Sequence, residues 1–281
     1  MSAAEAPSLP APGRLGVLGW PVFHSRSPAM HNAALRALRL DHAYAYQHLP
    51  APPPLLREIV RALGPAGLAG AKVTIPHKHA ALALADTASA TARAIGAANT
   101  LTFLPGGGIE AENTDAPGLL QAIGRDPAGT SVQVLGAGGS ARAAAYALRN
   151  AGASVRVWNR TPERARRLAA DLKVEAVDRP RGATILVNTT TVGMDERTSE
   201  ADALRSLGLD SDALGSYEQV VDLVYSSAPT PLLTAARSRG LATVDGLEVL
   251  VAQGALSFRR WTGRVAPLQV MREAAEGGRH G

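Results

Sequence analysis

The chain has 281 residues, a length that suits two ordinary domains and is short for three. Hydrophobic residues make up 46% of it and charged residues 19%, which supports folded cores and excludes a largely disordered chain. Aromatic residues make up only 4%, the net charge is +5 with the basic residues scattered, and cysteine is absent, so the composition disfavours nucleic-acid binding, disulfides and thiol chemistry.

Residues 1–13 are predicted to form a flexible leader, because they combine prolines, a glycine and Glu5 without the basic start and apolar run of a signal peptide. Later apolar stretches, such as residues 247–256, fall well short of the roughly 20 residues that cross a bilayer. We therefore expect a soluble, cytoplasmic protein that binds neither membranes nor nucleic acids.

The chain after the leader alternates between predicted strands and helices. Strands are expected at 14–19, 43–49 and 70–75, and helices are expected from Ser27 onward and at 54–63. Ser27 is predicted to be the N-cap of its helix, with Pro28 in the first turn. Residues 100–103 and 109–112 flank a glycine-rich turn and predict a hairpin. The β-α-β rhythm predicts a mainly parallel sheet.

A second series of strands and helices follows the hairpin. Strands are expected at 131–135, 154–158, 184–187, 219–223 and 242–244, and helices at 141–150 and after Pro162. This series is long enough to form a domain of its own. Residues 247–261 have a helical period and are expected to pack back on the first domain. The sequence therefore predicts an α/β protein with two domains.

A glycine-rich turn stands between the strand predicted at 131–135 and the helix after it. Gly136, Gly138 and Ala141 fill the pattern G-x-G-x-x-A. In such a turn the first glycine permits a tight bend, the second lets the backbone approach a pyrophosphate, and the small third residue lets the helix pack closely on the strand. The helix N-terminus adds N–H groups and a positive dipole. This context predicts a dinucleotide site.

The strand predicted at 154–158 indicates which dinucleotide binds. A site for NAD usually places Asp or Glu after this strand, whereas Asn159, Arg160 and Thr161 follow it here. A carboxylate would repel the 2'-phosphate of NADP, while a guanidinium binds it through paired, charge-assisted hydrogen bonds. We therefore hypothesise that the cofactor is NADP and that Arg160 is its main selective contact.

Metal and hydrolase chemistry have little support in the sequence. The histidine pairs at 24 and 31 and at 77 and 79 lack accompanying ligands, and the pattern G-x-S-x-G of serine hydrolases is missing. Hydride transfer between a nicotinamide and a carbonyl needs a proton donor at the oxygen that becomes a hydroxyl. Lys78 and Asp115 are candidates, because both come after predicted strands, where α/β sheets place their ligand crevice.

Short polar side chains near the same strand ends suit a small ligand rich in oxygen. They are Ser25, Ser27, Thr74 and Asn99. Taken one at a time, each of these side chains is more often an ordinary surface residue. The residues alone therefore predict an NADP-linked reductase of a small polar carbonyl and go no further.

Nine segments, in order and over nearly the whole chain, resemble those of shikimate dehydrogenases. They are GWPVFHSRSPAMHN, KVTIPHK, GAANT, ENTDAPG, GAGGSARA, NRT, NTTTVGM, DLVY with TPLL, and DGLEVLVAQGALSF. The resemblance implies the NADP-dependent, reversible reduction of 3-dehydroshikimate to shikimate, a step in chorismate and aromatic amino acid biosynthesis. It also implies a substrate domain of residues 14–115 and 247–281, with an inserted Rossmann domain of residues 116–246 that binds NADP.

The resemblance assigns roles to particular positions. Ser25 and Ser27 match hydroxyls that hold the substrate carboxylate; Lys78 and Asp115 match the catalytic pair; Thr74, Asn99 and Gln253 match groups that bind ring hydroxyls or orient the pair; and Tyr225 matches a residue lining the cleft. The cofactor positions are Gly136, Gly138, Gly139, Ser140, Ala141, Asn159, Arg160, Thr161, Thr189, Thr190, Met194 and Gly246. Lys78 is then the general acid and Asp115 holds it, although either member can carry the moving proton.

One departure from the family concerns the substrate. The family commonly has Asn, a substrate contact, where this chain has Lys72, which is charged, longer and able only to donate. Lys72 either points away or brings a second cation toward the substrate carboxylate, which would favour a related cyclic acid such as quinate. Two other functions stay open: a dehydrogenase for such an acid, and a non-catalytic NADP-binding regulator, against which the intact pair Lys78 and Asp115 argues. We expect a monomer or a homodimer.

Overall fold

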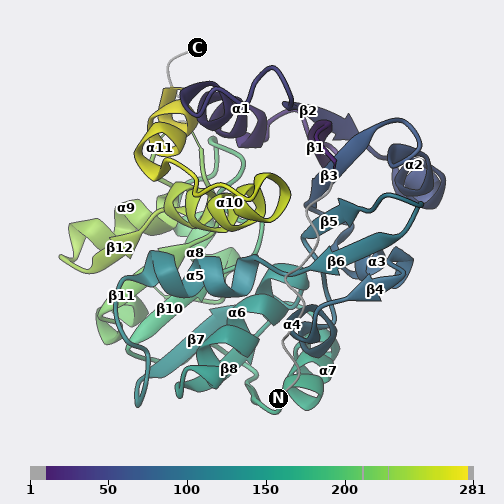
Figure 1. The fold of residues 1–281 in the computed structure, drawn as a ribbon. Helices are drawn as coiled ribbons and strands as arrows, with labels where there is room; N and C mark the ends of the chain where they lie inside the picture. Colours follow the sequence, from purple (N-terminus) through teal and green to yellow (C-terminus); the bar gives the residue numbers. More distant parts are fainter. Residues whose placement is uncertain (1–10, 211, 227, 278–281) are drawn as a thin grey trace.

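The structure is a computed structural model that describes residues 11–210, 212–226 and 228–277. The leader expected at 1–13 falls mostly outside these ranges and stays a prediction. Within the described ranges, no helix combines the length and the apolar character needed to cross a membrane. Two six-stranded sheets with helices around them form the two domains of an α/β fold (Figure 1).

The first sheet is built by the N-terminal part of the chain. Its strands are β1 (Arg14–Gly19), β2 (Ala45–Pro50), β3 (Leu68–Val73), β4 (Thr87–Ala88), β5 (Thr100–Phe103) and β6 (Ile109–Glu112), and its helices are α1 (Ser27–Ala37), α2 (Leu56–Leu63), α3 (Lys78–Leu84) and α4 (Ala90–Ile95). The strand order is β2-β1-β3-β5-β6-β4. β1 pairs in parallel with β2 and β3, and β5 and β6 form the expected antiparallel hairpin.

The second sheet is parallel throughout. Its strands are β7 (Ser131–Leu135), β8 (Ser154–Trp158), β9 (Glu175–Ala176), β10 (Ile185–Asn188), β11 (Gln219–Asp222) and β12 (Ala242–Val244), and its helices are α6 (Gly139–Asn150), α7 (Pro162–Leu172), α8 (Glu200–Ser206) and α9 (Pro231–Ser238). The order β9-β8-β7-β10-β11-β12 is that of a Rossmann sheet. In this order β8 and β9 follow on one side of the first strand, β7, and the later strands follow on its other side. Dinucleotides bind at this switch point, here beside β7.

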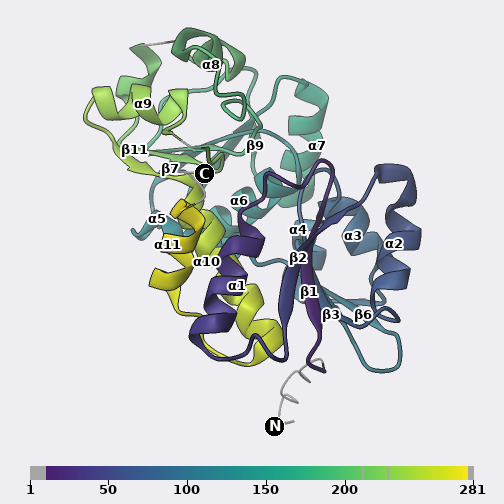
Figure 2. The same ribbon diagram turned by 90° about the horizontal axis from the view of Figure 1, so that it is seen from above.

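The described residues also form two short 3-10 helices, Pro53–Leu55 and Asp212–Ser216, and three further α-helices, two of which lie between the sheets. The three α-helices are α5 (Asp115–Ile123), α10 (Gly246–Thr262) and α11 (Leu268–Gly277). Figures 1 and 2 place α5 and α10 side by side between the two sheets, and α11 beside α1. Val249 of α10 belongs to the core of the second domain, whereas Val251 and Phe258 belong to that of the first. The C-terminal helices therefore return to the first domain, and α10 contributes to both cores.

Two local predictions need correction. Ser27 is not the N-cap of α1: Arg26 precedes the helix, and Ser27 and Pro28 both lie in its first turn. Proline is tolerated at either of these positions, because the first N–H groups of a helix have no partner within it. The strand predicted at 43–49 begins at Ala45, because the backbone N–H groups of residues 43 and 44 donate to the carbonyl of Leu40 in a turn.

Helices α5 and α10 approach each other closely at Gly118. A Cβ atom built on Gly118 would lie 2.7 Å from the Cβ and 2.8 Å from the Cα of Gln253. Glycine is therefore required here for packing, since any side chain would meet the backbone of the facing helix. This close approach sets the distance between α10 and α5 at Gln253.

We expect Gly118→Ala to destabilise the protein by about 1–2 kcal/mol. Alanine gains up to about 1 kcal/mol in helix propensity over glycine, but overpacking against a rigid neighbour costs about 1–3 kcal/mol, so the clash decides the sign. Urea unfolding of the wild type and the variant measures the difference. Gly277→Ala in α11 is the matched control, because nothing lies within 4 Å of the added Cβ. Equal stability of both variants and the wild type would contradict the packing argument.

Candidate active site

A pocket lies where the two sheets and the helices between them meet. Many of the residues predicted for substrate and nicotinamide line it together: Ser25, Ser27, Thr74, Lys78, Asn99, Asp115, Ser140, Thr189, Thr190, Met194, Tyr225, Gly246 and Gln253. Lys72 also lines it. The predicted residues at 136, 138, 139, 141 and 159–161 lie outside this lining, around the ends of β7 and β8. The pocket therefore collects side chains from segments far apart in the sequence.

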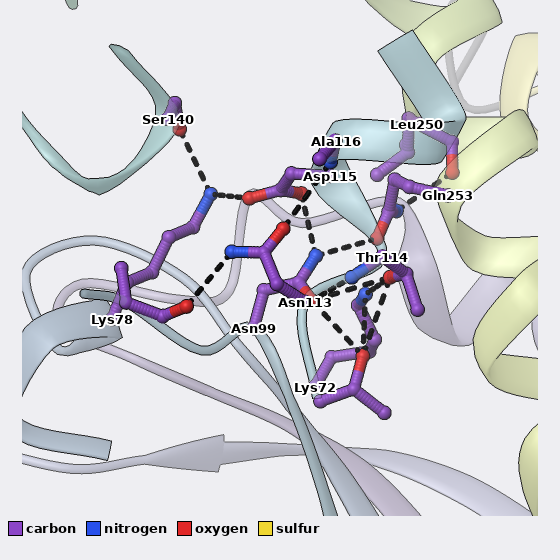
Figure 3. A network of polar contacts seen from close by, with 12 residues as sticks. Lys72, Lys78, Asn99, Asn113, Thr114, Asp115, Ala116, Ser140, Leu250 and Gln253 are labelled. Atoms are coloured by element: carbon purple, nitrogen blue, oxygen red, sulfur yellow. Dashed lines mark hydrogen bonds and ion pairs between the residues drawn. The ribbon is translucent and has the colours of Figure 1, made fainter. Parts of the chain in front are cut away.

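The centre of the pocket is an ion pair between Lys78 and Asp115 (Figure 3). The Nζ atom of Lys78 lies 2.6 Å from Oδ2 of Asp115 and donates to Oγ of Ser140 at 2.8 Å. Each side chain of the pair is 13% exposed. Asp115 is the first residue of α5 and Lys78 the first of α3. A helix N-terminus favours the carboxylate and disfavours the ammonium, so Lys78 depends on Asp115 for compensation.

Asn99 holds the other oxygen of Asp115. Its amide nitrogen donates to Oδ1 of Asp115 at 2.5 Å and to Oε1 of Gln253 at 3.4 Å. Burial alone raises the pKa of the Asp115 carboxyl, but the charges of Lys78 and Lys72, with hydrogen bonds from Lys78 and Asn99, outweigh it and hold the pKa below its ordinary value. Asp115 is therefore a carboxylate at neutral pH, able to accept further hydrogen bonds.

Hydroxyl groups gather at the β1 side of the pocket. Ser27 is buried, and its backbone N–H donates to Oγ of Ser25 at 3.3 Å. Burial raises the pKa of the Tyr225 hydroxyl, while hydrogen bonds from Ser25 and the backbone of Arg26 work against this rise. Tyr225 is therefore a neutral phenol at physiological pH. Neutral hydroxyls that lie close together can donate hydrogen bonds to the carboxylate of a small ligand.

The glycine-rich turn leaves room for a phosphate group. Gly136 has a φ of +113°, and a Cβ there would lie 2.5 Å from Oγ1 of Thr189, so only glycine fits. Gly138 precedes α6, and a Cβ atom built on it would meet nothing within 4 Å, so its backbone faces open space. Ala141 is fully buried in the helix behind it. These residues fit the pyrophosphate of a dinucleotide at the N-terminus of α6.

The residues after β8 fit the adenosine end of such a ligand. The amide of Asn159 donates to the backbone carbonyl of Thr161 at 2.9 Å and closes a small turn. Arg160 is exposed in the middle of this turn. The turn offers a guanidinium at the place where NAD-binding domains usually carry a carboxylate.

The loop from residue 188 to residue 194 is held in place by hydrogen bonds to Asn188, which is itself bonded to Asp222. The Oδ1 atom of Asn188 accepts from the backbone and hydroxyl of Thr190, and its amide donates to Asp222 at 2.9 Å. Burial raises the pKa of Asp222 to about 7, against hydrogen bonds from Thr230, Val224 and Asn188. Met194, at the end of the loop, is 43% exposed and lines the pocket. An apolar side chain on a well-anchored loop is suited to contact the flat face of a ring.

Sequence reasoning missed a group of hydroxyls behind Asn99. Thr100, Thr114 and Ser257 surround the Nζ atom of Lys72, and all are buried. The Nζ atom of Lys72 thus lies among these hydroxyls, and Lys72 also forms part of the pocket lining. Thr100 and Thr114 stand next to Asn99 and Asp115 in the quoted motifs, and Ser257 is one helical turn after Gln253. The sequence therefore places each hydroxyl close to a predicted site residue, but it does not show that the three gather around Lys72. Among the described residues, no cluster of three His, Cys, Asp or Glu side chains can hold a metal ion.

A Rossmann sheet with a phosphate-sized turn, joined through one pocket to a buried lysine and carboxylate, defines an oxidoreductase that works with a nicotinamide dinucleotide. Comparison with known proteins agrees with this class. Residues 17–101 match the shikimate dehydrogenase substrate binding domain, residues 119–186 match shikimate / quinate 5-dehydrogenase, and residues 246–276 match the shikimate 5'-dehydrogenase C-terminal domain.

Individual relatives match over nearly their full length. A shikimate dehydrogenase (NADP(+)) of Methanopyrus kandleri is 41% identical over 279 residues, which cover 92% of this chain and 93% of the relative. The crystal structure of a Thermus thermophilus shikimate 5-dehydrogenase with NADP(H) and shikimate has a TM-score of 0.83 at 41% identity, covering 94% of this chain and 98% of that one. The ligand-free 5-ketofructose reductase of a Gluconobacter strain has a TM-score of 0.80 at 29% identity, with coverage of 94% and 98%. The chain belongs to the shikimate dehydrogenase family.

Proposed function

We propose that this protein is an NADP-dependent shikimate dehydrogenase that reversibly reduces 3-dehydroshikimate to shikimate for aromatic amino acid biosynthesis. The observation that carries the proposal is the ion pair of Lys78 and Asp115, 2.6 Å apart, in a pocket that reaches from the serines of the first domain to the loop of Met194 in the second. Family membership supports the substrate and the cofactor. We propose residues 14–115 with 247–281 as the substrate domain and residues 116–246 as the nucleotide domain.

The pocket orients a cyclic hydroxy acid through its two ends. Ser25 and Ser27, with Tyr225 beside them, donate to the carboxylate of the substrate. Thr74, Asn99 and Gln253 offer hydrogen bonds to ring hydroxyls, and Asp115 accepts from the hydroxyl next to the carbonyl. This arrangement holds the reacting carbonyl against Lys78, and such positioning is a large part of catalysis.

Lys78 acts at the carbonyl oxygen. A bound NADPH would supply the hydride, and Met194 and its loop would hold the nicotinamide ring. Lys78 Nζ, held by Asp115 and Ser140, donates the proton to the oxygen that becomes a hydroxyl. The Asp115 carboxylate holds Lys78 aligned before transfer, and it accepts from Nζ again when the proton is taken up in the oxidation direction. The open turn at Gly138 and the exposed Arg160 serve the pyrophosphate and the 2'-phosphate.

We expect Lys78→Ala to lower kcat by about 10²–10⁴-fold, the usual range for loss of a general acid, while the KM for substrate changes little. Initial rates with 3-dehydroshikimate and NADPH measure both constants. Lys173→Ala is the matched control, because Lys173 ends α7 at the surface, remote from the pocket lining. Thermal unfolding of each variant establishes that it is folded. Near-normal turnover of a folded Lys78→Ala enzyme would remove Lys78 from the mechanism.

We expect Arg160→Ala to raise the KM for NADPH by tenfold or more and to leave the KM for NADH nearly unchanged. The reason is that a charge-assisted contact to the 2'-phosphate, on the order of 1.5–3 kcal/mol, exists with only one of the two cofactors. Arg167→Ala, which removes another exposed arginine from the neighbouring helix α7, is the control for net charge. Equal effects of Arg160→Ala on both cofactors would reject its selective role.

The substrate has a second candidate class. Residues 119–186 match a domain named for both shikimate and quinate dehydrogenases, and the Gluconobacter relative is named for a different polar ketone, so the fold accommodates related carbonyl substrates. The Nζ atom of Lys72 donates to three hydroxyls behind Asn99 and is directed toward them, which supports shikimate over quinate. The intact pair of Lys78 and Asp115 disfavours a non-catalytic NADP-binding regulator.

Initial rates with shikimate and quinate, each with NADP and NAD, test the assignment. We expect kcat/KM to be highest for shikimate with NADP. A higher value for quinate would transfer the assignment to the second class, and absence of turnover with all four combinations would favour the regulator. Size-exclusion chromatography with light scattering distinguishes the monomer from the homodimer, both of which fit the proposal.

A further inference from the structure

Lys72 is a buried lysine near the C-terminal end of β3, with only 5% of its surface exposed. Its Nζ atom donates to three hydroxyl oxygens: Thr114 Oγ1 at 2.8 Å, Ser257 Oγ at 2.9 Å and Thr100 Oγ1 at 3.1 Å. These hydroxyls come from β5, from the residue before α5, and from α10. The ammonium therefore meets a different element through each of its three N–H groups.

The three hydroxyls are arranged so that each can accept from Lys72 and donate away from it. An ammonium has three donors and no acceptor, whereas a hydroxyl has one proton to give. Thr100 and Thr114 donate to Oδ1 of Asn99 at 3.1 and 3.2 Å, and Ser257 donates to the backbone carbonyl of Gln253 at 3.1 Å. The hydroxyl oxygens also lie 3.0–3.3 Å from one another. Without the ammonium, they can turn their protons toward each other instead.

Asn99 is the residue on which this network acts. Its Oδ1 atom accepts from both threonine hydroxyls and from the backbone N–H of Thr114 at 2.8 Å. Because these three donors all point to Oδ1, the amide nitrogen of Asn99 must face the opposite way, toward Asp115 and Gln253. Figure 3 shows Asn99 between Lys72 on one side and Asp115 on the other. A reversed amide would set its N–H groups against three donors and its oxygen against the Asp115 carboxylate.

We propose that Lys72 is a positioning residue: by donating to Thr100, Thr114 and Ser257 it directs their protons outward, so that Asn99 presents its amide nitrogen to Asp115. This inference rests on the catalytic roles proposed above for Asp115 and Lys78. It assigns to Lys72 an effect on turnover without contact with the substrate. Lys72 thereby acts, through Asn99, on the oxygen of Asp115 that Lys78 does not contact.

Lys72 interacts electrostatically with groups from several elements. Its pKa is affected by the charges of Asp115 in α5, Lys78 in α3 and Glu112 in β6, and its own charge affects the pKa of His31 in α1. Burial lowers the pKa of Lys72 to about 7; Asp115 and Glu112 raise it, and Lys78 lowers it. Burial, with the charge of Lys72, lowers the pKa of His31 to about 3, so His31 is neutral throughout this range.

The sign of the pH effect follows from the hydrogen count on Nζ. Below about pH 7, the ammonium donates to all three hydroxyls and the network is complete. Above it, the amine keeps two N–H groups and gains a lone pair, so one hydroxyl turns its proton toward Nζ. The oxygen of Asn99 then loses a donor when that hydroxyl is one of the threonines. Turnover that depends on the network therefore decreases as the pH rises through the pKa of Lys72.

Lys72→Met tests this role, because methionine fills similar space without N–H groups. We expect kcat to fall about tenfold, on the scale of one lost hydrogen bond, while the KM values for substrate and NADPH change less than about threefold. We also expect the wild-type profile of kcat against pH to contain an ionisation near pH 7 that is absent from Lys72→Met. An unchanged kcat, or a profile that keeps this ionisation in the variant, would overturn the proposal.

A second pair of variants decides the matter if Lys72→Met does not fold. Thr100→Val removes a hydroxyl that donates to Asn99, whereas Ser257→Ala removes one whose proton goes to a backbone carbonyl. We expect Thr100→Val to lower kcat several-fold more than Ser257→Ala. Equal effects would mean that the group merely fills space.

Failure of this inference is distinguishable from failure of the proposed function. Should a folded Lys78→Ala enzyme turn over normally, the catalytic pair itself is wrong, and the role of Lys72 is rejected with it. Should Lys78→Ala be inactive while Lys72→Met keeps both the wild-type kcat and its pH profile, the catalytic pair stands and only the role of Lys72 is rejected.

Discussion

The site depends on a buried carboxylate that accepts hydrogen bonds on both of its oxygens. Asp115 accepts from Lys78 on one oxygen and from Asn99 on the other, and it stands at the N-terminus of α5. Removal of a charge from water is costly unless it is paired and hydrogen-bonded. Because Asp115 has both kinds of compensation, the carboxylate remains ionised although only 13% of its side chain is exposed. The position of Lys78, at the N-terminus of α3 where a cation is disfavoured, is tolerable for the same reason.

The compensation comes from elements that only the tertiary fold brings together. Ser140 at the start of α6 accepts from Lys78, so the glycine-rich turn also contacts the proposed general acid. A Cβ on Gly139 would lie 2.8 Å from the Cβ of Lys78, which leaves no space between the two segments. The glycine-rich turn and Lys78 are thus in contact, and the geometry of one constrains the other.

The features that could be predicted from the sequence are those that depend on neighbouring residues. The glycine-rich turn, the hairpin at 100–112 and all strands of the second sheet except the two-residue β9 follow from local patterns, and the fold class is confirmed. The prediction of Ser27 as the N-cap of α1 was wrong, because proline is suited to either of the first two helical positions and so does not fix where the helix begins. The direction of Lys72 could not be predicted, because it depends on Ser257, which is 185 residues away in sequence. Burial of a lysine becomes favourable only when all three acceptors are in place.

Helix α10 connects the pocket to the three hydroxyls of Thr100, Thr114 and Ser257 behind it. Gln253 and Ser257 are four residues apart and therefore lie on the same face of this helix, one toward Asn99 and the other toward Lys72. The same face passes Gly118 of α5 at backbone contact, which sets its distance from Asp115. Because Val249 packs in the core of the second domain and Phe258 in that of the first, a shift of α10 would move both networks together. The C-terminal helix is therefore a structural part of the site, although it supplies neither member of the ion pair.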